Sequence, residues 1–230
     1  MVTQNEAGRY LRHSIGWLGK IADKIVVYDD RSTDRTVEIC RELGCIVHER
    51  EGAVPSFLAD EAEFRAAAWR TLAAEVDRGD WILAIDADEF LIATNGETER
   101  GELERLAEMA FGSDGYAVNI REVFDVVDGE PMIRVDNYWG AITGVRFVQW
   151  TPDAAFPAKK MGCGSVPAAI KHTTIAPGLD ILHYGYAKNE DRQAKHLRYS
   201  RRAGHNPKHI ASILQPPTLR RYEHHHPGVG

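Results

Sequence analysis

The sequence lacks the features of disulfide-rich, zinc-thiolate and membrane-spanning proteins. Its 230 residues include only three cysteines, and no two of them form a C-x-x-C pair, which argues against a disulfide framework and a thiolate zinc site. No segment approaches the roughly 18 consecutive apolar residues that a membrane-spanning helix needs. Residues 1–9 also lack the basic-then-apolar order of a signal peptide. These absences predict a soluble, cytoplasmic protein whose cysteines are small core residues.

The sequence also lacks an excess of basic residues. Lys and Arg total 28 against 34 Asp and Glu, a formal net charge of −6, which is unfavourable for generic nucleic-acid binding. Residues 188–223 are the exception, because they carry nine Lys and Arg against three acidic residues. Two interpretations of this segment remain open: a basic face for phosphates, an anionic partner or a membrane surface, or a solvated helix followed by a loose tail.

What the sequence does contain is an alternation of apolar strands and amphipathic helices. Strands are predicted over 24–28, 45–48 and 81–85, and helices over 34–43 and 56–76. This order predicts right-handed crossovers and an α/β domain with a mostly parallel central sheet flanked by helices. Ligands bind such sheets at the carboxyl ends of their strands.

The second half of the chain has a different character. Residues 115–124 and 132–150 resemble strands of mixed polar and aromatic content, whereas Gly, Pro and Lys dominate 151–178. Residues 190–202 are compatible with a helix. The prolines and histidines that follow predict a loosely ordered tail over 206–230.

Acidic residues follow two of the predicted strands. Asp29 and Asp30 end the first, and Asp86 and Asp88 follow the strand at 81–85. Paired carboxylates beside an apolar core repel each other and lose hydration, and a bound Mn2+ or Mg2+ removes that conflict. Such a cation also neutralises a diphosphate leaving group. A plain turn with Asx hydrogen bonds is the alternative, but the second acid pair favours the metal.

Three sequence blocks in this order resemble the family 2 glycosyltransferases, which have the GT-A nucleotide-sugar-binding fold. They are Asn5-Glu6, then I-V-V-Y-D-D-R-S-T-D-R-T over 25–36, then W-I-L-A-I-D-A-D-E over 81–89. The resemblance covers roughly residues 2–95. The family's first strand normally precedes the Asn-Glu pair, so here that strand is short or the start is truncated.

The resemblance implies a set of donor-binding residues. They are Asn5, Glu6, Asp29, Asp30, Arg65 and Asp86. Asn5 and Glu6 would lie beside the nucleoside, and Asp30 would accept a hydrogen bond from the base. Asp86 would contact the ribose or the metal. Arg65 would meet the sugar or phosphates, although a solvated helix arginine is the alternative.

The same resemblance implies a metal site made by Asp86, Asp88 and His183. Related GT-A enzymes often take a late histidine ligand after a short apolar strand, and Ile181-Leu182-His183-Tyr184-Gly185 has that form. A neutral imidazole suits an octahedral site with carboxylates and phosphate oxygens. A buried, hydrogen-bonded histidine is the alternative.

The catalytic residues predicted are Asp88, through the metal, and a carboxylate base. An inverting transferase needs such a base to deprotonate the acceptor hydroxyl. Glu122, Asp125 and Asp153 lie in the relevant region, and we favour Glu122. A retaining mechanism needs no such base, so the stereochemical outcome stays open.

The predicted function is metal-dependent transfer of a hexose, preferably from a UDP-sugar, to an unidentified acceptor hydroxyl. The domain would comprise a nucleotide-sugar-binding half over 1–115, an acceptor-side half over 116–205 and the tail. Two alternatives remain: a non-catalytic nucleotide-sugar binder of the same fold, and a metal-dependent phosphohydrolase or nucleotidyltransferase.

Overall fold

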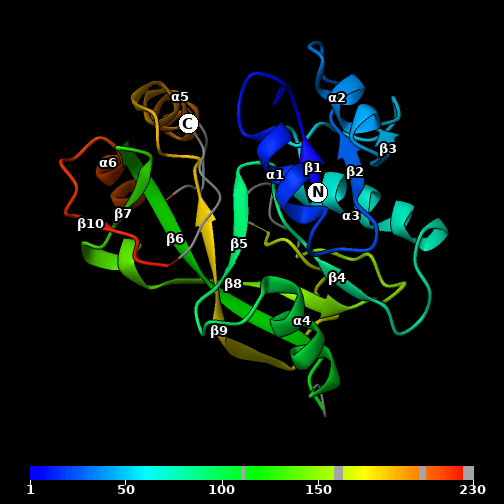
Figure 1. Cartoon of the computed structure of the whole chain (residues 1–230). Helices are drawn as coiled ribbons and strands as arrows, with labels where there is room; N and C mark the ends of the chain where they lie inside the picture. Colours follow the sequence, from blue (N-terminus) through cyan, green and yellow to red (C-terminus); the bar gives the residue numbers. More distant parts are fainter. Residues whose placement is uncertain (110–111, 158–162, 202–205, 225–230) are drawn as a thin grey trace.

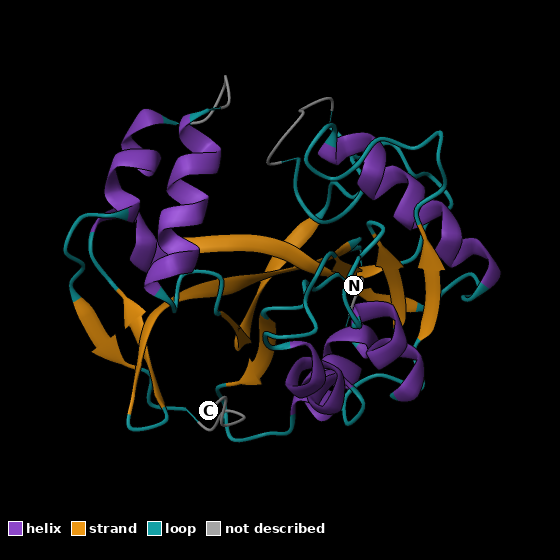
Figure 2. Ribbon diagram, turned by 90° about the horizontal axis from the view of Figure 1, so that it is seen from above, coloured by secondary structure: helices purple, strands orange, loops and turns teal. Residues whose placement is uncertain are grey.

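Two β-sheets and six α-helices make up the described part of the chain. We analysed a computed structural model, which describes residues 1–109, 112–157, 163–201 and 206–224. Figure 1 shows the small sheet with β1, β2 and β3 beside the larger sheet that carries the rest of the strands. Viewed from above, the helices over 189–200 and 207–213 lie at one end of the long strands, and the helices over 11–18, 36–42 and 61–71 lie toward the other end (Figure 2).

The small sheet is parallel and has the order β1-β2-β3. Its strands and the two helices that connect them are β1 (Val2–Thr3), α1 (Leu11–Leu18), β2 (Val26–Asp29), α2 (Thr36–Glu42) and β3 (Ile46–Glu49). The helix predicted over 34–43 is confirmed as α2, which ends before Gly44, a glycine at φ +81. Such a left-handed residue terminates a helix without the steric cost of a side chain.

The larger sheet is mixed. Its seven strands are β4 (Trp81–Leu83), β5 (Glu89–Ala93), β6 (Gly115–Val127), β7 (Glu130–Arg134), β8 (Ile142–Gln149), β9 (Thr173–His183) and β10 (Leu219–Arg221). The order β10-β7-β6-β8-β4 is antiparallel throughout, and β9 pairs antiparallel with β5 and parallel with β6. The prediction of a mostly parallel central sheet is therefore wrong.

The difference arises at β4. This strand was expected to lie in a parallel sheet, but it pairs antiparallel with β8, and a single bridge between Val2 and Asp86 joins the two sheets. The chain after β6 reverses in a two-residue turn, with Asp128 at φ 53 and Gly129 at φ 80. Two successive positive φ values are typical of a tight hairpin, which makes β6 and β7 antiparallel neighbours.

The remaining helices are α3 (Glu61–Thr71), α4 (Glu99–Glu108), α5 (Asn189–Ser200) and α6 (Pro207–Ile213), with 3-10 turns at η1 (Leu72–Ala74) and η2 (Asn137–Ala141). Asp60 begins α3 by accepting the Glu63 N–H, and Thr98 begins α4 by accepting the Gly101 N–H. Side-chain caps of this kind satisfy amides that the first helical turn leaves unpaired. No helix in the described residues has the length and apolarity to cross a bilayer.

The main core lies over the central strands. Leu91, Ile92, Leu179 and Ile181 are fully buried where β5 and β9 pair. Cys40, Cys45 and Cys163 are buried and unpaired with one another, in agreement with their prediction as core residues.

The C-terminal segment differs from the predicted loose tail. Residues 207–221 contain α6 and β10, and β10 pairs with β7. Ile213 and Tyr222 are buried, so this segment is packed against the sheet. Residues 225–230 lie outside the described part of the chain.

Candidate active site

The loop that follows β1 is hydrogen-bonded to the loop that follows β2. Asn5 has φ 55, a left-handed conformation that Asn tolerates well. Its backbone N–H donates to Ser32 Oγ at 2.8 Å, and its side-chain oxygen accepts the Thr33 N–H at 2.8 Å. The Glu6 N–H donates to Thr36 Oγ1 at 2.7 Å. The loop with the Asn-Glu pair and the loop with the S-T-D-x-T run are therefore joined by hydrogen bonds.

Asp29 links the end of β1 to the loop after β2. Its fully buried carboxylate accepts hydrogen bonds from the Thr3 hydroxyl at 3.0 Å, the Ser32 hydroxyl at 2.6 Å and the Ser32 N–H at 2.7 Å. Three hydrogen bonds from within the protein thus engage the Asp29 carboxylate, which the sequence analysis placed among the residues that bind the nucleotide sugar. Its contact with a ligand stays a prediction.

Asp30 directly follows β2 and is buried. Its side chain pairs with Arg50 and accepts the Phe57 N–H at 2.9 Å. The carboxylate is 1% exposed, so contact with a nucleobase requires the Arg50 or Phe57 contact to change. The predicted base contact is untested.

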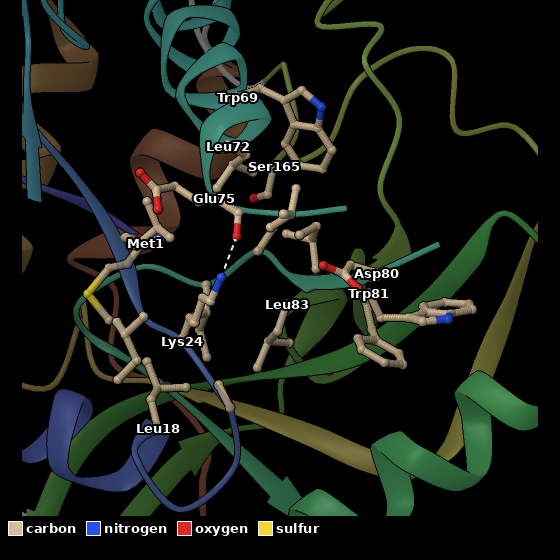
Figure 3. A pocket seen from close by; sticks show the side chains of 18 of the residues that line it. Met1, Leu18, Lys24, Trp69, Leu72, Glu75, Asp80, Trp81, Leu83 and Ser165 are labelled. Atoms are coloured by element: carbon tan, nitrogen blue, oxygen red, sulfur yellow. Dashed lines mark hydrogen bonds between the residues drawn. The ribbon is translucent and has the colours of Figure 1, made fainter. Parts of the chain in front are cut away.

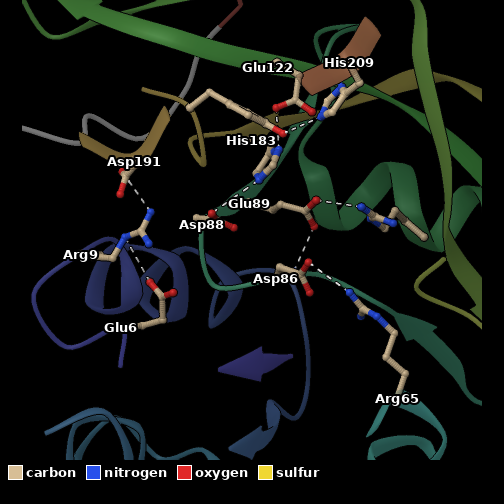
Figure 4. Close-up of polar contacts among 12 residues, drawn as sticks. Glu6, Arg9, Arg65, Asp86, Asp88, Glu89, Glu122, His183, Asp191 and His209 are labelled. Carbon is tan, nitrogen blue, oxygen red and sulfur yellow. Dashed lines mark hydrogen bonds and ion pairs between the residues drawn. The ribbon is translucent and has the colours of Figure 1, made fainter. Parts of the chain in front are cut away.

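The turn between β4 and β5 directs its two aspartates to different partners. The Glu89 N–H donates to the Asp86 carbonyl at 3.1 Å, and Glu89 Oε2 accepts the Asp86 N–H at 3.0 Å. Asp86 Oδ2 lies 3.5 Å from Arg65 Nη2, whereas Asp88 Oδ2 lies 3.5 Å from His183 Nε2 (Figure 4). The turn therefore separates the carboxylates of the D-x-D motif.

Arg65 is not a solvated helix residue. It is 8% exposed. Its guanidinium donates a hydrogen bond to the Glu61 carboxylate at 2.9 Å and also faces Asp86. Burial alone would lower the pKa of Arg65, but the Asp86 and Glu61 carboxylates raise it. Arg65 is thus a fixed cation that holds Asp86 on its side of the turn.

His183 occupies the last position of β9, between two other strands. The register places it opposite Glu89 on β5 and Glu122 on β6. Its Nδ1 lies 2.6 Å from Glu122 Oε2, and its Nε2 faces Asp88. Burial alone would lower the pKa of His183, but the Glu122 and Asp88 carboxylates raise it well above its ordinary value.

Glu122 is buried, with 6% of its surface exposed. Glu122 and Asp88 contact opposite edges of the imidazole (Figure 4), an arrangement suited to fixing the ring. The alternative base candidates, Asp125 and Asp153, are exposed. The base role of Glu122 stays a prediction.

Two basic residues that sequence reasoning did not select also reach this site. Arg9 joins Glu6 at 3.6 Å to Asp191 at 3.1 Å, which ties the loop after β1 to the start of α5. Lys195 of α5 lies over the Tyr186 ring at 4.2 Å. Neither residue belongs to a motif, and only the fold brings them to Asp88.

A divalent cation fits part of this arrangement. In the residues that the structure describes, no group of three or more His, Cys, Asp or Glu side chains is positioned to hold a metal. Asp88 Oδ2 and His183 Nε2, however, are 3.5 Å apart, close to the roughly 3 Å between adjacent vertices of an octahedron with bonds of about 2.1 Å. Glu122 on the far ring nitrogen is the usual support of a metal-binding histidine. Asp86 is not brought to this pair, and its metal or ribose role is untested.

A separate cavity of about 500 Å³ lies between β2 and β4. Its lining is largely apolar, with Leu18, Trp69 and Leu83 on its walls, and Lys24 donates to the Glu75 carbonyl at its edge (Figure 3). Arg65 and Asp86 reach its border. The cavity therefore abuts the back of the D-x-D turn.

Comparison with known proteins shows the family of the chain. The sequence model of the family described as "Glycosyl transferase family 2" matches residues 1–130. Uncharacterized glycosyltransferases of Rickettsia bellii and Rickettsia felis are each 36% identical over 91 residues, which is 40% of this chain. Those matches span only 27% and 28% of the length of the two relatives.

Solved structures show a similar fold. The crystal structure of S. aureus TarS superposes with a TM-score of 0.50 at 17% identity, over 93% of this chain and 41% of that protein. TarS 1–349 in complex with UDP-GlcNAc gives a TM-score of 0.48 at 15% identity, over 93% of this chain and 68% of that one. The chain thus has an α/β fold similar to that of TarS.

Proposed function

The chain belongs to glycosyl transferase family 2, and on that premise we propose that it transfers a sugar from a UDP-sugar, with a divalent cation, to an acceptor hydroxyl. The observation that carries this proposal is the Asp88–His183 pair, backed by Glu122 and lying near Arg9 of the loop after β1. TarS, with which this chain shares its fold, has been crystallised with UDP-GlcNAc.

Five residues of the site have a role in this proposal. Asp88 and His183 hold Mn2+ or Mg2+, and Glu122 keeps the imidazole turned so that Nε2 faces Asp88. The cation, when bound, neutralises the charge that develops on the diphosphate leaving group. Asn5 and Asp30 bind the nucleoside at the ends of β1 and β2.

The acceptor is the less defined half of the reaction. We propose that the basic surface of α5, with Arg198 and Arg201, faces an anionic acceptor, because α5 adjoins Asp88 through Lys195 and Arg9. If transfer is inverting, we propose Glu122 as the base, with the exposed carboxylates Asp125 and Asp153 as the alternatives. A hexose as the transferred sugar is likewise part of the proposal.

A panel of nucleotide sugars with and without Mn2+, followed by thermal unfolding, tests the function. A ligand at 100 times its dissociation constant stabilises the folded state by about 2.7 kcal/mol. Asp88→Asn should remove the Mn2+-dependent part of the shift, whereas Asp23→Asn, at a side chain 83% exposed, should retain it. An unchanged response of Asp88→Asn contradicts the ligand assignment.

The same samples separate the rival functions. Donor binding without transfer or slow donor hydrolysis in Mn2+ indicates a non-catalytic binder. Hydrolysis or exchange of nucleotides that carry no sugar indicates a phosphohydrolase or nucleotidyltransferase.

A further inference from the structure

Three side chains from separate elements converge on the space beside Gly185. They are Lys195 of α5, His183 of β9 and Asp88 of the turn before β5. A Cβ added at residue 185 would lie 2.9 Å from Asp88 Oδ2 and still closer to Lys195 Nζ and His183 Nε2. Because residue 185 has no side chain, all three groups can approach the same point beside its backbone.

The charges around this point are arranged for one cation. His183 Nε2 lies 3.5 Å from Asp88 Oδ2, and Lys195 Nζ approaches the same point beside Gly185. The Asp88 carboxylate thus faces the Lys195 ammonium as well as the imidazole. A divalent ion that entered beside Lys195 would be repelled by its ammonium at close range.

Lys195 can leave this position without moving its helix, by giving up its contact with the Tyr186 ring. Its side chain is half-buried, and α5 contributes no buried residue over Asn189–Ser200. The helix is held instead by Arg192, which donates to the Phe124 and Tyr186 carbonyls at 2.7 Å, and by Asp191. Both anchors are independent of Lys195, so its flexible side chain can move without moving the helix.

We propose that the Lys195 ammonium and a divalent cation are alternative occupants of the space in front of Asp88 and His183, and that Lys195 moves onto the donor diphosphate when the cation enters. This inference rests on the proposed function, because it takes Asp88 and His183 as the metal ligands. Lys195 is then both a competitor of the free metal and a ligand of the nucleotide. The metal binds weakly alone and tightly together with a nucleoside diphosphate.

The competition predicts opposite changes for two ligands. Lys195→Met should tighten Mn2+ binding without nucleotide by roughly tenfold, the size expected when a unit charge about 5 Å from a divalent ion is removed in a water-like dielectric. It should weaken UDP binding at saturating Mn2+ by roughly tenfold, since a hydrogen bond to a charged group is lost. A purely structural lysine would not move the two affinities in opposite directions.

Titration calorimetry of the full chain with MnCl2 alone, and with UDP at saturating Mn2+, measures both affinities. Lys188→Met makes the same charge change at an exposed residue beside α5, and should alter neither affinity by more than about twofold. Gly185→Ala in the Lys195→Met background should remove the gain in Mn2+ affinity, because its methyl group fills the shared space. Circular dichroism checks that each variant is folded, and Lys195→Gln replaces Lys195→Met if the latter is not.

The outcomes are distinct. Mn2+ affinity that is unchanged or weaker in Lys195→Met overturns the competition, even if UDP binding is normal. If the variant with both Gly185→Ala and Lys195→Met keeps the gain in Mn2+ affinity, the cation binds elsewhere, and the competition is also overturned. Failure of the parent protein to bind UDP with Mn2+ instead overturns the proposed function.

Discussion

Removal of one partner of the buried Glu89–Arg146 ion pair should destabilise the protein by several kcal/mol. Arg146 Nη2 lies 2.8 Å from Glu89 Oε1, and the two side chains are 11% and 3% exposed. Arg146→Met would leave the Glu89 carboxylate buried without its cation, which costs about 3–5 kcal/mol. Glu89→Gln would leave the guanidinium without its anion, at a similar cost.

The double variant gives the sharper measurement. Glu89→Gln with Arg146→Met leaves neither charge buried alone, so the loss should be smaller than the sum of the single losses by about 1.5 kcal/mol or more. Urea unfolding followed by tryptophan fluorescence gives the three free energies. Arg100→Met is a matched control, since Arg100 is 44% exposed and pairs with Asp23 and Glu104 at the surface; its loss should stay under about 1 kcal/mol.

The reasoning is refuted if Arg146→Met costs no more than Arg100→Met, or if the single losses simply add. The pair also bears on the site, because Glu89 Oε2 accepts the Asp86 N–H and Arg146 Nη1 donates to Ser165 Oγ at 2.6 Å. Both single variants should therefore also weaken donor binding.

Two further predictions concern pH and the C-terminal segment. Burial raises the pKa of Glu6 from 4.5 to about 7 despite the nearby Arg9, so the folded state holds this proton more tightly than the unfolded chain. The free energy of unfolding should therefore fall as pH rises from about 4.5 to about 7, and Glu6→Gln should flatten that slope in urea titrations; equal slopes would contradict the assignment. Ile213→Ala should cost about 2–5 kcal/mol by urea unfolding, whereas Leu214→Ala, at a residue 48% exposed, should cost about 0.5 kcal/mol or less; equal losses would mean that α6 is not packed as described.

Local signals in the sequence predicted the first half of the fold. The apolar run before Asp29 and the glycine at 44 mark β2 and the end of α2 because strand burial and helix termination depend on residues close in sequence. The partner of β4 could not be obtained in this way, since its apolar residues suit a parallel or an antiparallel neighbour equally. The Asp128-Gly129 dipeptide does carry a hairpin signal, and reading it would have indicated antiparallel strands.

Site residues could be predicted from the sequence where they belong to a recognisable motif. Asp88 and His183 were selected separately, 95 positions apart in the chain, and the fold brings them together. Asp86 was selected by the same motif, yet the turn directs it to Arg65. Lys195 has no such motif, because a lysine on a polar helix has the same local pattern whether it faces solvent or a carboxylate. Its role depends on where α5 packs, which no short stretch of sequence specifies.

The pairing of β9 with both β5 and β6 fixes the position of His183 in the sheet. His183 lies opposite Glu89 on one side and Glu122 on the other, so its place is set by the pairing of β9 with two strands at once. A change in the register of either neighbouring strand would therefore move the imidazole away from Asp88.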